Sequence, residues 1–133
     1  VNDLCRQAVT TGKMTIKSSG TQVRDFISLF DVCSVVEHLV KNKANHIDYH
    51  ILNVGFGKSI SVFEMAKMIK ERCNTVLGFE PILKYSKKEP CEQQEPLEFC
   101  VDSLANLGIT LEGNINLEID ELLHSCTNWF KSS

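Results

Sequence analysis

The sequence lacks the features that define several common classes of protein. It has no apolar run close to the roughly 20 residues that a membrane helix needs. It has no block of basic residues, because 14 basic and 17 acidic residues are spread along the chain for a net charge of −3. Its first residues lack the basic-then-apolar order of a secretory signal. We therefore expect neither nucleic acid nor a membrane as a partner.

The cysteines are also too far apart for a metal or redox motif. No two of the six have the spacing of a CxxC or zinc-knuckle pair. Four lie in apolar patterns typical of helices, where a free cysteine behaves as a small hydrophobe: Cys5, Cys33, Cys73 and Cys126. This usage favours a reduced, cytoplasmic protein without a metal site over a disulfide framework.

What is present indicates one small α/β domain. The chain has 133 residues, of which 43% are hydrophobic, enough for a modest core. Apolar residues at three-four spacing predict helices, and short alternating runs predict strands. The expected helices cover 3–11, a stretch that begins at Asp31, a stretch after Ser61, 102–107, and the segment from near Asn116 to the end. The expected strands are 14–17, 23–29, 49–54 and 81–85. Alternating helices and few strands favour a small mixed domain.

Local signals set the ends of these elements. Gly12 is expected to cap the first helix in the left-handed conformation, and Asp31 to cap the second. Ser61 and Glu64 have the spacing of a capping box. The charged stretch 86–96 contains two of the three prolines and is predicted to be a surface loop.

The segment from Gly20 to Ile27 contains the most informative residue. Arg24 lies between a glycine turn and an apolar strand, just ahead of a helix. A planar guanidinium can bind two phosphate oxygens through parallel hydrogen bonds, so this position is suited to a phosphate group. The alternative is an ion pair with Asp25 or another surface carboxylate.

Four blocks in order make the chain resemble the C-terminal part of the extended short-chain dehydrogenase/reductase family, the NAD-dependent nucleotide-sugar epimerases and dehydratases. They are the helix, glycine and strand of 5–16, the Gly-x-Gln-x-Arg-Asp-Phe segment at 20–26 with Asp31-Val32, the Asn-Val-Gly strand and helix of 52–66, and 102–109 with the closing helix to Trp129. The resemblance implies that residues 1–133 form a single substrate-binding region, and that the N-terminal NAD-binding Rossmann part is absent from the chain.

The resemblance also says which parts of such an enzyme are missing. The chain has no Gly-x-x-Gly-x-x-Gly turn to hold a dinucleotide at a helix N-terminus. It has no Tyr-x-x-x-Lys pair, because Asn53 and Glu89 follow Tyr49 and Tyr85 four positions later. We therefore expect no catalytic residue and no cofactor site in this chain, and NAD only in the complete enzyme.

By resemblance, Arg24 contacts the diphosphate of a nucleotide-diphosphate sugar. The backbone of Thr15 and Ile16 would lie by the nucleobase, although an ordinary strand explains them equally well. Ser61 caps a helix first, and a phosphate contact would be its second role.

The family often has a second phosphate-binding arginine in an Arg-x-Gly-Asp-like loop. This chain has Lys87 and Lys88 in the corresponding stretch. Lysine keeps the charge but loses the two-pronged geometry, so these side chains are either a weaker ligand contact or merely solvated.

Together these observations predict the nucleotide-sugar-binding part of an epimerase or dehydratase, inactive alone. The alternative is a non-catalytic binding or interaction module derived from that fold.

Overall fold

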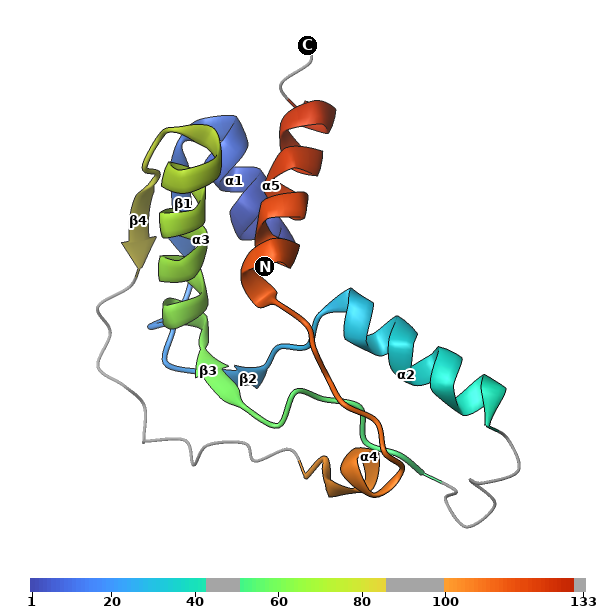
Figure 1. Cartoon of the computed structure of the whole chain (residues 1–133). Helices are drawn as coiled ribbons and strands as arrows, with labels where there is room; N and C mark the ends of the chain where they lie inside the picture. The colour runs from blue at the N-terminus through green and yellow to red at the C-terminus, as the bar shows by residue number, and fades with distance from the viewer. Residues whose placement is uncertain (43–50, 86–99, 131–133) are drawn as a thin grey trace. The chain divides into compact units, whose positions relative to one another are not determined.

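The computed structural model describes residues 1–42, 51–85 and 100–130. The chain divides into two compact units (Figure 1). Unit 1 comprises Val1–Arg24, Ile60–Glu95 and Asn116–Ser133, and unit 2 comprises Asp25–Ser59 and Pro96–Ile115. No helix in the described ranges is long and apolar enough to cross a bilayer.

Unit 1 is built on a short parallel pair of strands. β1 (Lys13–Ile16) pairs with β4 (Ile82–Tyr85), and Ile16 lies opposite Tyr85. Three helices accompany the pair: α1 (Asn2–Thr11), α3 (Val62–Leu77) and α5 (Ile115–Phe130). α1 packs against β1 and α3, and α3 packs against β4. Parallel strands end at the same edge, so this pair brings the residues after Ile16 close to Tyr85.

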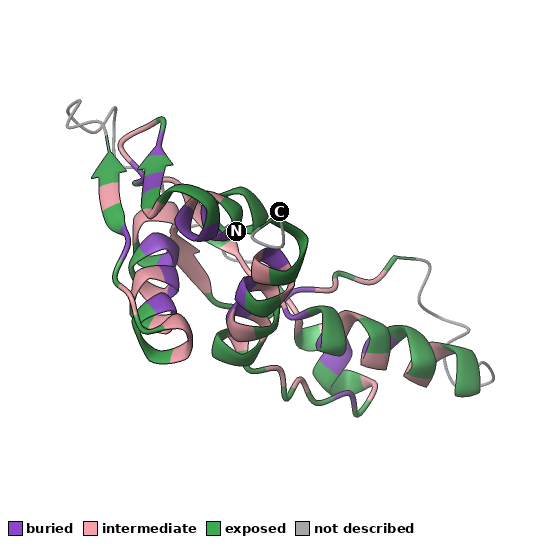
Figure 2. Cartoon of the chain, turned by 90° about the horizontal axis from the view of Figure 1, so that it is seen from above, coloured by how far each residue is buried: buried purple, intermediate pink, exposed green. Residues whose placement is uncertain are grey.

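The core of unit 1 lies among these helices and β1. Figure 2 shows its buried positions as stripes along the helices. Its fully buried members include Met14, Met65, Ile69, Ile119 and Leu123. Cys5, Cys73 and Cys126 are buried there too, and burial raises the pKa of the Cys5 thiol to about 12, so these cysteines act as small apolar side chains.

A bidentate ion pair joins α3 to α5. The Arg72 Nε donates to Asp120 Oδ1 over 2.7 Å, and the second guanidinium nitrogen donates to Asp120 Oδ2 over 2.5 Å. Both side chains are partly buried, so this pair fixes the two helices in one register.

Unit 2 contains α2 (Leu29–Lys41) and α4 (Asp102–Asn106) around a small apolar cluster. Val35, Leu104 and Ile109 are buried at its centre, and the side chains of Leu39, Leu52, Val54, Val101, Leu107 and Leu111 pack around them. Strands β2 (Val23–Asp25) and β3 (Ser59–Ser61) form a second two-stranded sheet.

A buried carboxylate organises the start of α2. Asp31 is 1% exposed. Its Oδ1 accepts the backbone N–H groups of Glu112 and Gly113, each over 2.9 Å, and its Oδ2 accepts the Ser28 hydroxyl over 2.9 Å. Because these donors satisfy the buried charge, Asp31 ties the helix to a loop that lies about 80 positions further along the chain.

The five predicted helices are confirmed, as are the left-handed cap at Gly12, the capping box at Ser61 and the strands near 14–17 and 81–85. Three details differ from the predictions. The second strand ends at Asp25, because Ser28 takes the cap position and α2 begins at Leu29. The cap is Ser28 and not Asp31. Residues 51–54 form no strand, since Leu52 and Val54 pack on the unit 2 cluster. The predicted loop 86–96 lies outside the described residues.

We predict that Gly113→Ala destabilises the protein by about 1–3 kcal/mol, the range for forcing extra atoms into a packed site. A Cβ at this position would lie 1.9 Å from Asp31 Oδ2 and 2.2 Å from the Ser28 hydroxyl oxygen. Urea unfolding would measure the loss. Glu112→Ala is the matched control, because its side chain is exposed and its backbone N–H is kept. Equal stability of the two variants would contradict the prediction.

Candidate functional site

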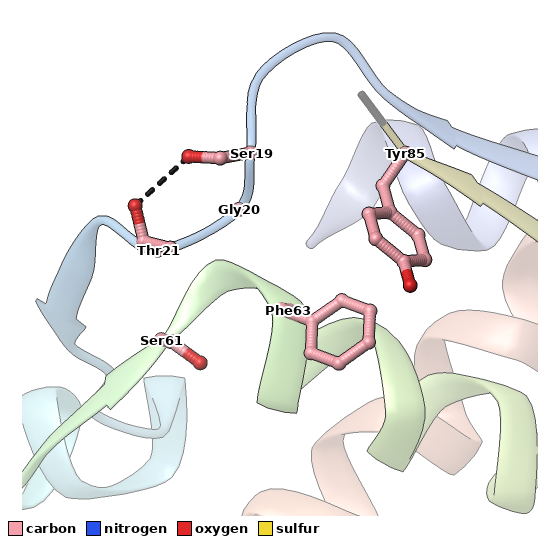
Figure 3. A pocket seen from close by; sticks show the side chains of 6 residues that line it. All are labelled: Ser19, Gly20, Thr21, Ser61, Phe63 and Tyr85. Atoms are coloured by element: carbon pink, nitrogen blue, oxygen red, sulfur yellow. Dashed lines mark hydrogen bonds between the residues drawn. The ribbon is translucent and has the colours of Figure 1, made fainter. Parts of the chain in front are cut away.

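A pocket of about 310 Å³ opens in unit 1 at the edge where β1 and β4 end. Three segments line it: Ser19, Gly20 and Thr21 from the turn after β1, Ser61 and Phe63 from the start of α3, and Tyr85 from the end of β4 (Figure 3). None of these six residues is acidic or basic. The pocket therefore combines hydroxyl groups with aromatic rings.

Backbone hydrogen bonds hold the turn against the start of α3. The Phe63 N–H donates to the Gly20 carbonyl over 3.0 Å, and the Val62 N–H donates to the Gln22 carbonyl over 2.9 Å. Gly20 has φ +77°, and a Cβ there would lie 3.1 Å from the Phe63 Cβ. The backbone conformation therefore favours glycine at this position, and a Cβ would make a tight contact with Phe63.

The hydroxyl groups at the pocket are partly engaged with one another. Ser19 Oγ and Thr21 Oγ1 are 2.8 Å apart, as the dashed line in Figure 3 marks. Ser61 Oγ accepts the Glu64 N–H over 3.0 Å and donates to the Glu64 carboxylate over 2.7 Å. A hydroxyl has one proton to donate, so Ser61 can only accept a further hydrogen bond, whereas one hydroxyl of the Ser19–Thr21 pair still has a proton for a ligand.

Glu64 determines the charge at this helix end. Its carboxylate accepts the Ser61 N–H over 2.8 Å as well as the Ser61 hydroxyl. These bonds hold the pKa of Glu64 below its ordinary value. The N-terminus of α3 therefore already carries an anion, which makes it an unfavourable place for a phosphate group.

The two rings meet edge to face. The centroids of Phe63 and Tyr85 are 4.9 Å apart with an angle of 64° between the ring planes, and Figure 3 shows the rings pointing toward one another. The Lys67 Nζ lies 4.7 Å from the Phe63 centroid. Tyr85 remains 44% exposed, so part of its ring is accessible to a ligand.

Arg24 lies on β2, three positions after Thr21, and its side chain is exposed. Its Nη1 donates to the Val23 carbonyl over 2.8 Å. Among the described residues no carboxylate forms an ion pair with it. The alternative prediction, an ion pair between Arg24 and Asp25, is therefore wrong. The Arg24 guanidinium keeps N–H donors available for an anion.

The Asp25 carboxylate binds backbone N–H groups. Its Oδ1 and Oδ2 accept the N–H groups of Phe56 and Gly57 over 2.8 and 2.7 Å. Both bonds lie within unit 2. They fix the start of the 56–57 loop beside the end of β2.

The other predicted contact residues have different environments. Thr15 is exposed, but its backbone N–H donates to Gln7 Oε1 over 2.9 Å, so a ligand would have to displace Gln7 to reach it. Ile16 is buried. Lys87 and Lys88 lie outside the described residues. Of the predicted set, Ser61 alone lines the pocket.

Sequence reasoning missed Ser19, Thr21, Phe63 and Tyr85 as members of one site. The turn after β1 and the capping box of α3 were both recognisable in the sequence, and in the structure they lie side by side. What was not recognisable is the register of β1 with β4, which brings Tyr85 to the same edge over almost 70 positions of sequence.

No family model matches the chain, and no curated protein matches it significantly in sequence. Solved structures do match in fold. RMD from Pseudomonas aeruginosa, solved with NADPH, has a TM-score of 0.72 at 16% identity over 96% of this chain and 41% of its own. UDP-glucuronic acid 4-epimerase from Bacillus cereus, solved with NAD, has a TM-score of 0.71 at 17% identity over 97% of this chain and 39% of its own.

UDP-N-acetylglucosamine 4-epimerase from Methanobrevibacter ruminantium, solved with UDP-N-acetylmuramic acid, has a TM-score of 0.67 at 21% identity over 99% of this chain and 39% of its own. The chain thus spans about two-fifths of the length of these enzymes. It shares its fold with a part of each of these enzymes, which agrees at the level of fold with the resemblance noted in the sequence.

We predict that Ser61→Ala costs about 1 kcal/mol of stability at pH 7, the usual effect of losing a helix cap. Glu64 has a lowered folded pKa, so its bonds stabilise the protein above the ordinary value of 4.5 and are lost as the pH falls through the folded value. The cost of the substitution should therefore shrink as the pH falls below 4.5. Urea unfolding across pH measures it.

Ser34→Ala is the control for this prediction, because it changes a serine within α2 and removes no cap. A cost at Ser61 that is the same at pH 7 and pH 3 would contradict a contribution from the Glu64 carboxylate.

Proposed function

We propose that this chain is the nucleotide-sugar-binding part of an NAD-dependent sugar epimerase or dehydratase, and that it has no turnover alone. The observation that carries the proposal is Arg24, an exposed guanidinium that lies on β2 and has no carboxylate partner in the described part of the chain. A diphosphate supplies the oxygen pairs that such a group binds bidentately.

The similar structures support this assignment. Among them are a UDP-glucuronic acid 4-epimerase solved with UDP-glucuronic acid and NAD, and an enzyme solved with UDP-N-acetylmuramic acid. Fold similarity at this identity does not transfer a substrate, so the nucleotide and the sugar are matters for a binding experiment.

The residues of this chain do not fit NAD. The N-terminus of α3 carries the Glu64 carboxylate, and the turn after β1 leads into β2 and not into a helix. A dinucleotide pyrophosphate needs a glycine-rich strand-to-helix turn. We therefore assign NAD to an N-terminal Rossmann partner outside these 133 residues, in a cytoplasmic enzyme, and derive no step through it.

The part played by this chain is then to bind and position. Arg24 holds the diphosphate, and Thr21, one of the residues that line the neutral pocket, lies three positions before it in the sequence. Lys87, Lys88 and the backbone of Thr15 and Ile16 remain proposed secondary contacts. Binding energy that positions the substrate raises the reaction rate only when another part of the enzyme supplies the catalytic groups.

A second candidate function rests on α2. Leu29, Val36 and Val40 are 67%, 54% and 59% exposed, although all three are apolar. Exposed apolar residues on one helix favour contact with another protein. The alternative function is therefore a non-catalytic interaction module.

We predict that the chain binds UDP-, dTDP- or GDP-sugars measurably in calorimetry and that Arg24→Ala weakens this binding about ten-fold or more, the effect of losing one charge-assisted hydrogen bond. The affinity of Arg24→Lys should lie between those of the wild type and Arg24→Ala, because lysine keeps the charge but cannot bind two oxygens through parallel hydrogen bonds. Added salt should weaken wild-type binding.

Arg6→Ala is the matched control for Arg24→Ala, since Arg6 is an arginine of the same unit that pairs with Asp3. Absence of saturable binding at millimolar ligand, in folded wild-type chain, would favour the interaction module instead. Epimerisation of a UDP-sugar by the chain with NAD would contradict the proposed lack of turnover.

A further inference from the structure

We propose that α2 is a self-association surface, on which an exposed apolar stripe packs antiparallel against the same stripe of a second copy of the chain. This outer stripe consists of Leu29, Cys33, Val36 and Val40. It includes no residue of the proposed ligand site, so the self-association is independent of nucleotide-sugar binding.

The helix α2 is apolar on two adjoining faces. Its inner face lies on the apolar cluster of unit 2, where Val35 is fully buried. The outer stripe follows the spacing i, i+4, i+7 and i+11, which aligns its side chains along the helix. Leu29, Val36 and Val40 are each more than half exposed, and Cys33 is exposed as well. α2 therefore presents more apolar surface than its own unit covers.

The spacing of the outer stripe indicates a helix as its occupant. Steps of four, three and four residues are those of a coiled-coil seam, in which each side chain inserts between residues of the facing helix. The order of these steps is the same from either end. An antiparallel copy therefore meets the stripe layer by layer, with Leu29 level with Val40 of the other copy and Cys33 level with Val36. A two-fold interface requires such a self-complementary patch.

The charges on α2 are compatible with a second copy. The outer stripe contains no acidic or basic residue, and beside it Lys41 Nζ donates to Glu37 Oε1 over 2.6 Å. Two stripes can therefore meet without repulsion between like charges. The antiparallel orientation also brings the negative C-terminal end of each helix dipole beside the positive N-terminal end of the other. A partner selected by its charge would find no group on the stripe to bind.

The length of the outer stripe limits the strength of the dimer. From Leu29 to Val40 the helix rises about 16 Å, roughly three turns. Four side chains from each copy give a contact below the roughly 1,200 Å² of total buried surface at which stable interfaces begin. We therefore expect a dimer that forms at high protein concentration and dissociates on dilution.

The test is sedimentation velocity of the 133-residue chain under reducing conditions, from about 10 μM to about 1 mM, the range of weak association. The mean mass of the wild type should rise from that of a monomer toward that of a dimer. Val36→Glu should weaken association ten-fold or more, because it places a carboxylate of each copy beside the two-fold axis. Circular dichroism and urea unfolding show whether the variant is folded.

Ile51→Glu is the matched control for Val36→Glu. It introduces the same charge at an apolar residue of unit 2 that is 85% exposed and lies outside α2. This variant should associate as the wild type does.

Cross-linking tests the antiparallel register in a Cys33→Ser background, which removes the native thiol of the stripe. Leu29→Cys and Val40→Cys chains are mixed and oxidised with diamide, which accepts two electrons and two protons as two thiols form a disulfide. The mixture should give a covalent dimer that neither chain gives alone, because Leu29 lies level with Val40 of the other copy. Cross-linking of each chain with itself would overturn the antiparallel register.

Two other results would overturn the self-association. One is a wild-type chain that stays monomeric at about 1 mM, which would leave the outer stripe to a different protein. The other is a dimer that persists unweakened in folded Val36→Glu. Neither result bears on nucleotide-sugar binding, which calorimetry of the Arg24 variants measures separately.

Discussion

The hydrogen bond from the Phe63 N–H to the Gly20 carbonyl is the contact on which the candidate site depends. It joins the turn after β1 to the first residues of α3, and Gly20 adopts there the left-handed conformation that favours glycine. The parallel register of β1 and β4 then brings Tyr85 to the same place. Two backbone constraints thus assemble side chains from three distant segments.

Charge divides the site into two environments. The capping box gives the N-terminus of α3 its own anion through Glu64, which satisfies the helix end and keeps the pocket suited to neutral groups. Arg24 presents a cation without a carboxylate partner in the residues that the structure describes. A ligand with one charged and one neutral end matches this division, and the solved structures of similar fold include complexes with such ligands.

Most of the fold follows from local signals in the sequence, and most of the pocket does not. Gly12 and the Ser61–Glu64 box mark helix ends because the groups they satisfy lie within four residues. The cap of α2 was assigned to Asp31 because aspartate caps helices well, but the Ser28 hydroxyl accepts the Asp31 N–H and is the cap, while the Asp31 carboxylate accepts the N–H groups of Glu112 and Gly113. Long-range register, which places Tyr85, leaves no local signal.

The most direct test of the account is an amide and side-chain NMR titration of the 133-residue chain with a UDP-sugar. The account predicts saturable shifts at Arg24, at the turn of Ser19 to Thr21, and at Phe63 and Tyr85, with the α2 residue Val36 unchanged. Shifts confined to α2, or none at millimolar ligand in a folded chain, would contradict it.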